Sequence, residues 1–141
     1  MSISSTGTIL QLAAEIYSAR GGHDGPHFAS PDGHLDPVAA IYRATTGRTP
    51  WSLQHDDEAA LLLLAYNEPA MDAIRWLSAV LPTLPPDTDG TPDHIEHVTH
   101  LASYAALGQP PARHNDVVGN LLRAAATADA LDYVPAQRAA A

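Results

Sequence analysis

Apolar residues recur at helical spacing along most of the chain. The spacing i, i+3, i+4, i+7 and i+8 predicts a helix over 8–20 whose buried face is made up of Ile9, Leu12, Ala13, Ile16 and Tyr17. A second helix is predicted over 37–46. Asp36 can cap its first turn, Pro37 suits the first helical position, and Gly47 ends it. The chain therefore opens with two helices joined by a polar loop.

The next two predicted helices differ in their apolar pattern. The segment "QHDDEAALLLLAY", residues 54–66, is apolar on nearly every side after an acidic first turn, which predicts a central, enclosed helix. The following segment, 67–81, begins with Asn67 or Glu68 as cap and Pro69 at the first position. It has one apolar face and ends before Pro82. This pattern is typical of an ordinary amphipathic helix.

Two further helices are predicted over 91–107 and 115–131, after the proline-rich loop "PTLPPDTDG". The loop "GGHDGPHFASPDGHL" between the first two helices is rich in turn formers and has room for one small β-hairpin around "SPDG". The pattern as a whole predicts an all-α, compact bundle of five to six helices.

Length and composition favour one soluble domain. The chain has 141 residues, of which 45% are hydrophobic and none is cysteine. We expect a single helical domain over 1–141, frayed at 1–7 and 134–141. Without cysteine, disulfides and thiolate zinc sites are excluded. The start lacks the pattern of a secretory signal, and no apolar run approaches a membrane span, so we expect a cytoplasmic protein with no membrane partner.

The charge balance argues against direct binding of nucleic acid. The formal net charge is −9, and the seven basic residues are scattered along the chain. No basic stripe exists to neutralise phosphates. The same acidity suggests an acidic mimic of nucleic acid as a less favoured interpretation.

The stretch "DHIEHVTH", residues 93–100, is rich in histidine and carboxylate. On a helical wheel at ~100° per residue, Ile95 and Val98 share the apolar face, and the polar residues of the stretch lie opposite. This pattern predicts a solvated helix face more than a metal site, because a tight site needs three or four fixed ligands.

The loop between the first two helices is the sharper metal candidate. A glycine-rich loop can bring side chains together that a rigid helix keeps apart, and this one offers four candidate ligands: His23, Asp24, His27 and His34. Their spacing matches no standard motif, neither the EF-hand loop nor "HExxH". The alternative to a divalent metal ion is an ordinary turn-forming, solvated loop.

Motifs for common enzyme chemistry are missing from the chain. There is no "GxSxG", no "SxxK", no phosphate-binding loop and no dinucleotide fingerprint, so no catalytic residue and no cofactor is expected. Trp51, in the loop "GRTPWSLQ", is the candidate partner contact. We therefore favour a non-enzymatic, acidic interaction or regulatory module that binds a protein partner or forms a homodimer through helix faces. The alternative is a metal-binding protein or metal-dependent hydrolase that uses loop 23–36.

Three segments carry a family resemblance: "LQLAAEIYSARGG", "HFASPDGHLDPVAAIYRATTG" and "HNDVVGNLLRAAA". In this order they resemble an uncharacterised family of small actinobacterial proteins, a domain of unknown function. In that family a glycine turn and a Trp-Cys or similar pair follow the first helix, and a "WND" element precedes the last helix. Here the cysteine is absent and His114 replaces the tryptophan. The resemblance implies a compact helical domain and carries no activity.

Overall fold

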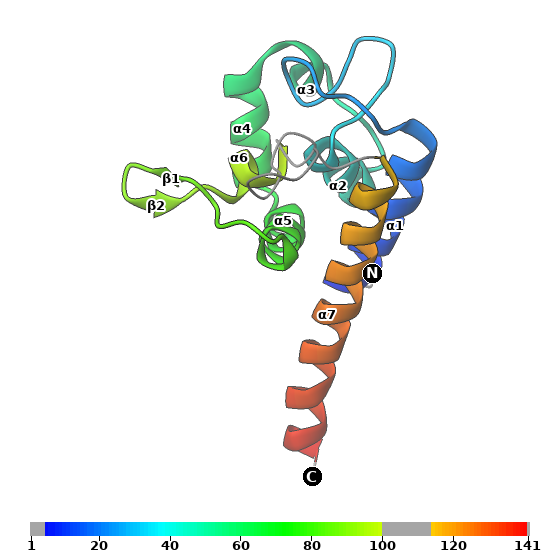
Figure 1. Ribbon diagram of the computed structural model, residues 1–141, viewed down its shortest axis with the longest axis vertical. Helices are drawn as coiled ribbons and strands as arrows, with labels where there is room; N and C mark the ends of the chain where they lie inside the picture. The colour runs from blue at the N-terminus through cyan, green and yellow to red at the C-terminus, as the bar shows by residue number, and fades with distance from the viewer. Residues whose placement is uncertain (1–4, 100–113, 141) are drawn as a thin grey trace.

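The structure is a computed structural model that describes residues 5–99 and 114–140 (Figure 1). Within these residues there are seven helices and a two-stranded antiparallel sheet, so the prediction of a mostly all-α fold is confirmed. The elements are α1 Thr6–Arg20, α2 Pro37–Thr46, α3 Trp51–His55, α4 Asp57–Ala65, α5 Glu68–Val80, β1 Asp87–Thr88, β2 Thr91–Pro92, α6 His94–Thr99 and α7 His114–Ala140.

The predicted helix boundaries of α2 and α5 are confirmed by their caps. The Asp36 side chain accepts a hydrogen bond from the Ala39 amide, and Gly47 ends α2 in the left-handed region at φ 81°. Asn67 caps α5 by accepting from the amide of Ala70. Both caps satisfy amides that the first helical turn leaves without a partner.

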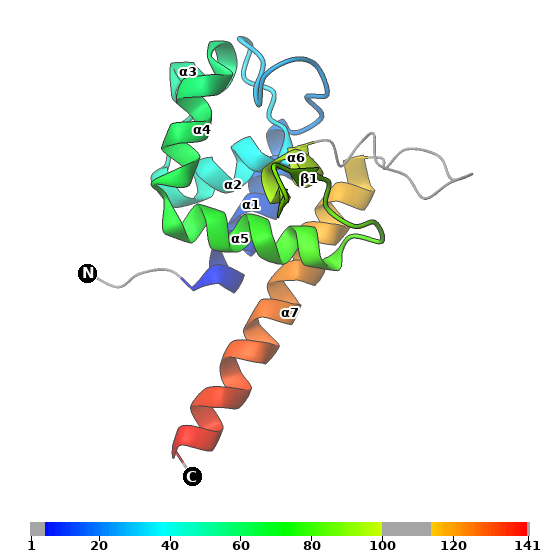
Figure 2. The ribbon, with the colours of Figure 1, turned by 90° about the vertical axis from the view of Figure 1, so that its left-hand side faces the viewer.

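The best-packed part of the molecule surrounds α1, α2, α5 and α7. Helix α1 lies between α2 and α7, and α5 crosses α7 (Figure 2). The contact between α1 and α7 is so close that a Cβ atom at Gly7 would overlap the Asp129 carboxylate. The buried face of α1 differs from the predicted one, because Leu10 and Ala14 are buried while Leu12 is exposed. Two helices enclose α1, so its buried surface is wider than a single stripe.

The segment 54–66 is not the central helix that its composition predicts. The structure divides it into the end of α3 and all of α4, with Asp56 capping α4 between them. Helix α4 stands at the edge of the molecule beside α3 (Figures 1 and 2). Only Ala60 and Leu64 of this helix are buried. Helical periodicity cannot distinguish an enclosed apolar helix from an apolar helix at an edge.

The region after α5 contains the one sheet found within the described residues. Strands β1 and β2 form a hairpin whose turn places Asp89 and Gly90 in the left-handed region. The loop between α1 and α2, where the sequence allows a hairpin, forms only isolated bridges, one of which joins Ala29 to Leu35. Helix α6 begins close to the predicted start, and the rest of the predicted helix 91–107 lies outside the described residues.

Among the described helices, none combines the length and apolarity needed to cross a lipid bilayer.

Candidate functional site

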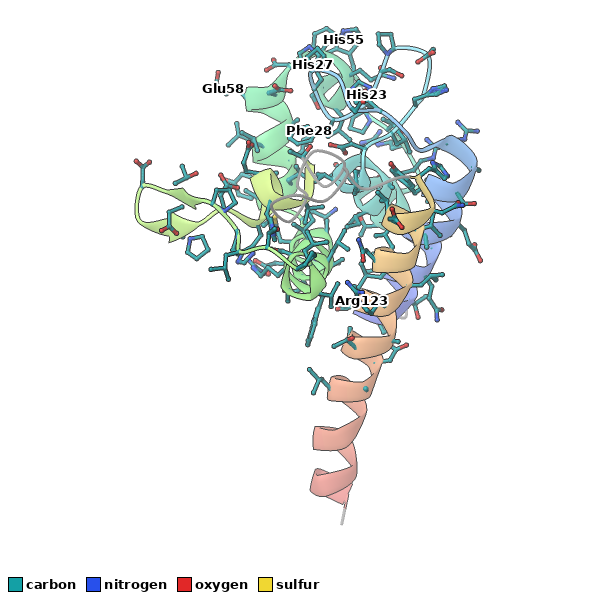
Figure 3. All side chains as sticks on the ribbon, viewed as in Figure 1. His23, His27, Phe28, His55, Glu58 and Arg123 are labelled. Carbon is teal, nitrogen blue, oxygen red and sulfur yellow. The ribbon has the colours of Figure 1, made fainter. Side chains whose placement is uncertain are left out.

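A pocket of about 230 Å³ lies where the loop between α1 and α2 meets the start of α4 and helix α6. It is lined by residues 23–28 and by Asp36, Asp57, Glu96 and Thr99. Figure 3 shows His23 and His27 on this loop, near the start of α4. Three segments that are distant in the sequence therefore contribute titratable side chains to one cavity.

Helix α3 holds the loop in place. The amides of Phe28 and Ala29 both donate to the carbonyl of Leu53, each at 3.0 Å, and Leu53 is fully buried. His27, directly before these anchors, adopts φ 69° in the left-handed region. That conformation is uncommon for a residue with a side chain, and the neighbouring hydrogen bonds maintain it. The loop thus places the His27 ring at a fixed position on the pocket rim.

Hydrogen bonds orient both histidines of the pocket. The His27 Nδ1 atom lies 2.9 Å from an Asp57 carboxylate oxygen, and the His23 Nε2 atom lies 2.8 Å from the carbonyl oxygen of Pro26. Oxygens of these two kinds can only accept, so the ring nitrogens donate. In a neutral imidazole, the second nitrogen of each ring is then an acceptor.

Asp36 is the buried carboxyl group of the pocket. It is 2% exposed, caps α2 through Ala39, and accepts a hydrogen bond from the Thr99 hydroxyl. Burial raises the pKa of Asp36 to about 8, against the lowering effect of these hydrogen bonds. The neutral, protonated form of this carboxyl group therefore predominates at neutral pH.

The structure brings together three of the four predicted metal ligands. His23, Asp24 and His27 line the pocket, whereas His34 lies outside it, with its ring 3.9 Å from Asp32. No three histidine or carboxylate side chains within residues 5–99 and 114–140 are arranged to hold a metal ion. The metal site stays a prediction.

Spacing along the chain could not indicate the contributions of Asp57, Glu96 and Thr99 to the pocket. These residues follow the loop by about thirty to seventy positions and reach it only through the packing of α4 and α6. The predicted role of Asp36 as a helix cap is confirmed, but its second oxygen faces Thr99. The Asp36 carboxyl group thus caps α2 and also lines the pocket.

The stretch 93–100 is not uniformly the solvated face that its pattern predicts. Glu96 is exposed, but His97 is fully buried. The two ring nitrogens of His97 lie 2.7 Å from the hydroxyls of Ser78 and Thr83. Burial lowers the pKa of His97, and nearby His94 adds to the effect. These hydroxyls come from outside α6, so the helical wheel could not reveal that a polar residue here is satisfied in the core. His100 lies outside the described residues.

A second feature of the surface is the exposed apolar set on α3, on α4 and at Tyr66, the residue that ends α4. Trp51 is 66% exposed, Leu62 is 58% exposed and Tyr66 is 87% exposed, and Leu61 and Leu63 of α4 are also exposed. The Trp51 ring lies against the ring of His55 on the same helix, and the two ring centroids are 4.9 Å apart. We refer to Trp51, Leu61, Leu62, Leu63 and Tyr66 as the α3–α4 apolar surface.

Comparison with protein families identifies the family of the chain. Residues 1–128 match a family described as "Family of unknown function (DUF6197)". The chain belongs to this family. The match includes every residue of the pocket and of the α3–α4 apolar surface, so both features lie within the family domain. No curated protein and no solved structure matches the chain.

Proposed function

We propose that the protein is a non-enzymatic, acidic interaction module that binds a protein partner, another copy of itself included, through the α3–α4 apolar surface. The observation that carries this proposal is the position of α4. Its composition is that of a buried helix, yet only Ala60 and Leu64 are buried. Large apolar side chains gathered on an exposed element are typical of surfaces that bind partners.

The residue types on this surface fit protein recognition. Tryptophan and tyrosine provide large contact areas at low cost in side-chain entropy and are enriched among residues that dominate binding. Helix α4 packs mainly against α3 and α5, which leaves the opposite side of the helix available to a partner. The Asp57 and Glu58 side chains of its first turn would form a polar border beside the leucines.

The alternative interpretations have less support from the geometry. An acidic mimic of nucleic acid needs carboxylates spaced along one surface, whereas Asp36, Asp56 and Asp93 accept hydrogen bonds from helix amides. A metal-dependent hydrolase would need three or more ligands that converge on one point, and residues 5–99 and 114–140 contain no such set. The absence of cysteine is compatible with a cytoplasmic site of action, which we include in the proposal.

The proposal is tested by comparing assembly states in cells of the organism that encodes the protein. The wild-type chain should migrate on native separation in a complex larger than its 14.9 kDa monomer. Leu62→Asp should return it to the monomer, because a charge in the centre of an apolar interface loses its solvation without gaining a partner.

Leu84→Asp is the matched control. Leu84 is 89% exposed, more than Leu62, but lies outside the α3–α4 apolar surface, so the control places the same charge on a freely accessible leucine elsewhere. It should leave the complex intact. A monomeric wild-type protein, or equal losses in the two variants, would contradict the proposal.

A further inference from the structure

Two histidines of α6 share one hydroxyl group of α5. The Ser78 hydroxyl lies 2.9 Å from the His94 Nδ1 atom and 2.7 Å from the His97 Nδ1 atom. The other ring nitrogen of His97, Nε2, lies 2.7 Å from the Thr83 hydroxyl. We propose that these four side chains form a pH-sensitive switch, which holds α6 on α5 while at most one of the two rings is charged and releases α6 when both are. This proposal does not depend on the partner surface above.

The hydrogen bonds can accommodate one added proton. The Ser78 hydroxyl has a single proton, so it can donate to only one ring at a time. When both rings are neutral, His97 can donate to Ser78, Ser78 to His94, and Thr83 to the Nε2 atom of His97. A proton on His94 makes its Nδ1 atom a donor, and all three hydrogen bonds then reverse direction. His94 is the ring that gains this proton first, because it lines a pocket beside β1 and β2, whereas His97 is fully buried.

A second proton, on His97, cannot be accommodated in this way. Both rings then direct an N–H group at Ser78, and the Ser78 proton has no acceptor left on either ring. Two positive charges would also flank one hydroxyl that is itself buried, where charge is unfavourable. Burial and the neighbouring His94 lower the pKa of His97, in agreement with this penalty. Because the released state can bind the second proton in water, acid pH favours release.

Release of α6 would affect the pocket beside the 23–28 loop. Glu96 and Thr99 of this helix line that pocket, and the Thr99 hydroxyl donates to the Asp36 carboxyl group. Val98, on the same helix, is fully buried in the core. Movement of α6 away from α5 would therefore remove one wall of the pocket and expose part of the core.

The other charged groups around the two rings come from α5, from the start of α2 and from α6 with its preceding residue. Arg75 lines the pocket of His94 and is paired with Asp72 on α5. Asp93 caps α6 by accepting from the Glu96 amide. Asp36, before α2, keeps its proton below pH 7, since burial raises its pKa to about 8. Histidine is the residue type that ordinarily changes charge between pH 7 and pH 5, so we expect the two rings to respond in this range.

The test is amide hydrogen exchange of the full-length protein between pH 7 and pH 5, measured by mass spectrometry and corrected for the intrinsic effect of pH. Relative to α1, segment 94–99 should exchange faster as the pH falls, by up to about ten-fold per pH unit for the one extra proton that the released state binds. Ring nitrogen shifts in nuclear magnetic resonance spectra report the charge of each histidine over the same range. Exchange of segment 94–99 should increase with the charging of His97 and not with that of His94.

His94→Asn tests whether two charges are required. The asparagine amide can accept from Ser78 and cannot be charged, so His97 can take up a proton while the hydrogen bonds persist. At pH 5 the variant should exchange at segment 94–99 about ten-fold more slowly than the wild type, the effect of keeping one hydrogen bond to a charged group. His55→Asn is the matched control, because it removes an exposed histidine of α3, and it should behave as the wild type. If exchange at pH 7 shows that His94→Asn is misfolded, the ring titration of the wild type decides alone.

Three results would overturn the proposal. Simultaneous loss of protection in α1 and in segment 94–99 would mean that acid unfolds the whole chain without a local switch. Faster exchange when His94 alone is charged, or slow exchange when both rings are charged, would mean that the shared hydroxyl does not control α6. An equal increase in the wild type and in a folded His94→Asn variant would mean that His94 has no part in the response.

Discussion

The enclosed region around α5 and α6 and the exposed corner formed by α3 and α4 place side chains of the same kinds in different surroundings. Leu77 on α5 is fully buried, whereas Leu62 on α4 is largely exposed. His97 on α6 is buried between two hydroxyls, whereas the His27 side chain, beside α4, is 36% exposed. Packing explains the leucines and histidines of the first region, but it does not explain those of the second.

This difference separates residues that hold the fold from residues available for binding. Burying a leucine stabilises a protein by about 1.5–3 kcal/mol relative to leaving it exposed, and an exposed leucine makes no such contribution. The apolar side chains of α4 therefore need an explanation other than the stability of this chain. The proposed protein partner would supply that explanation, and the same reasoning yields predictions that compare the two regions.

The largest expected effect is a loss of stability when a leucine of the enclosed region is shortened. Leu77→Ala should lower the free energy of unfolding by about 2–5 kcal/mol, because it leaves a cavity in a well-packed core. Leu62→Ala should change it by no more than about 0.5 kcal/mol. Urea denaturation of the isolated protein measures both. Similar losses in the two variants would mean that α4 is enclosed in solution and offers no surface to a partner.

The second prediction concerns the buried histidine. His97→Ala should cost about 2–3 kcal/mol at pH 7, since it creates a cavity and removes a hydrogen-bond partner from the Thr83 hydroxyl and one of two such partners from the Ser78 hydroxyl. Because the folded-state pKa of His97 is lowered, the unfolded chain binds the extra proton first as the pH falls below about 6.5. Wild-type stability should therefore decrease at acid pH.

Denaturation curves measured between pH 7 and pH 5 give the loss of stability on acidification. This loss should be smaller in His97→Ala than in the wild type, because the variant lacks the ring that the unfolded chain protonates first. Val98→Ala is the control, because it truncates a buried neighbour on α6 that has no titratable group. It should retain the wild-type acid profile. An unchanged profile in His97→Ala would show that the ring is not held neutral by burial.

The third prediction concerns a change that builds up only as the pH rises, at Asp36, which lies where the two regions meet. Its folded-state pKa of about 8 exceeds the ordinary value of 3.8, so the folded protein keeps a proton that the unfolded chain has lost. Stability from this group is present at acid pH and is lost as the pH rises through about 8.

Asp36→Asn keeps an acceptor for the Ala39 amide but cannot ionise. Between pH 5 and pH 9 the variant should gain about 1 kcal/mol or more in stability relative to the wild type. Thermal denaturation across this range measures the difference. Asp72→Asn, which changes an exposed carboxylate paired with Arg75, should follow the wild-type curve. Parallel curves for Asp36→Asn would contradict burial of an ionisable group at this position.

Local signals predicted the helices with clear boundaries. Asp36, Pro37 and Gly47 each have a defined role at one end of a helix, and these roles do not depend on the rest of the fold. The start of α5 at Asn67 and Pro69 is of the same kind. Such elements could be placed from the sequence because their determinants lie within a few residues of one another.

The features that the sequence could not predict depend on contacts between distant segments. His97 is buried because α5 contributes Ser78 and the following loop contributes Thr83. Helix α4 is exposed because no described element covers its outer side, which its all-round apolar pattern cannot show. The pocket likewise required Asp57 and Glu96 to approach the histidine loop from other helices. The loop residues alone indicated only part of the site.

Site-specific photocrosslinking in cells of the encoding organism tests directly whether α4 carries a partner surface. A photoreactive phenylalanine analogue is placed at position 62 on α4 or, as control, at the more exposed position 84. We expect a discrete adduct with one protein, a second copy of the chain or a single partner, at position 62 and none at position 84. No adduct at position 62, or the same adducts at both positions, would contradict a partner surface on α4.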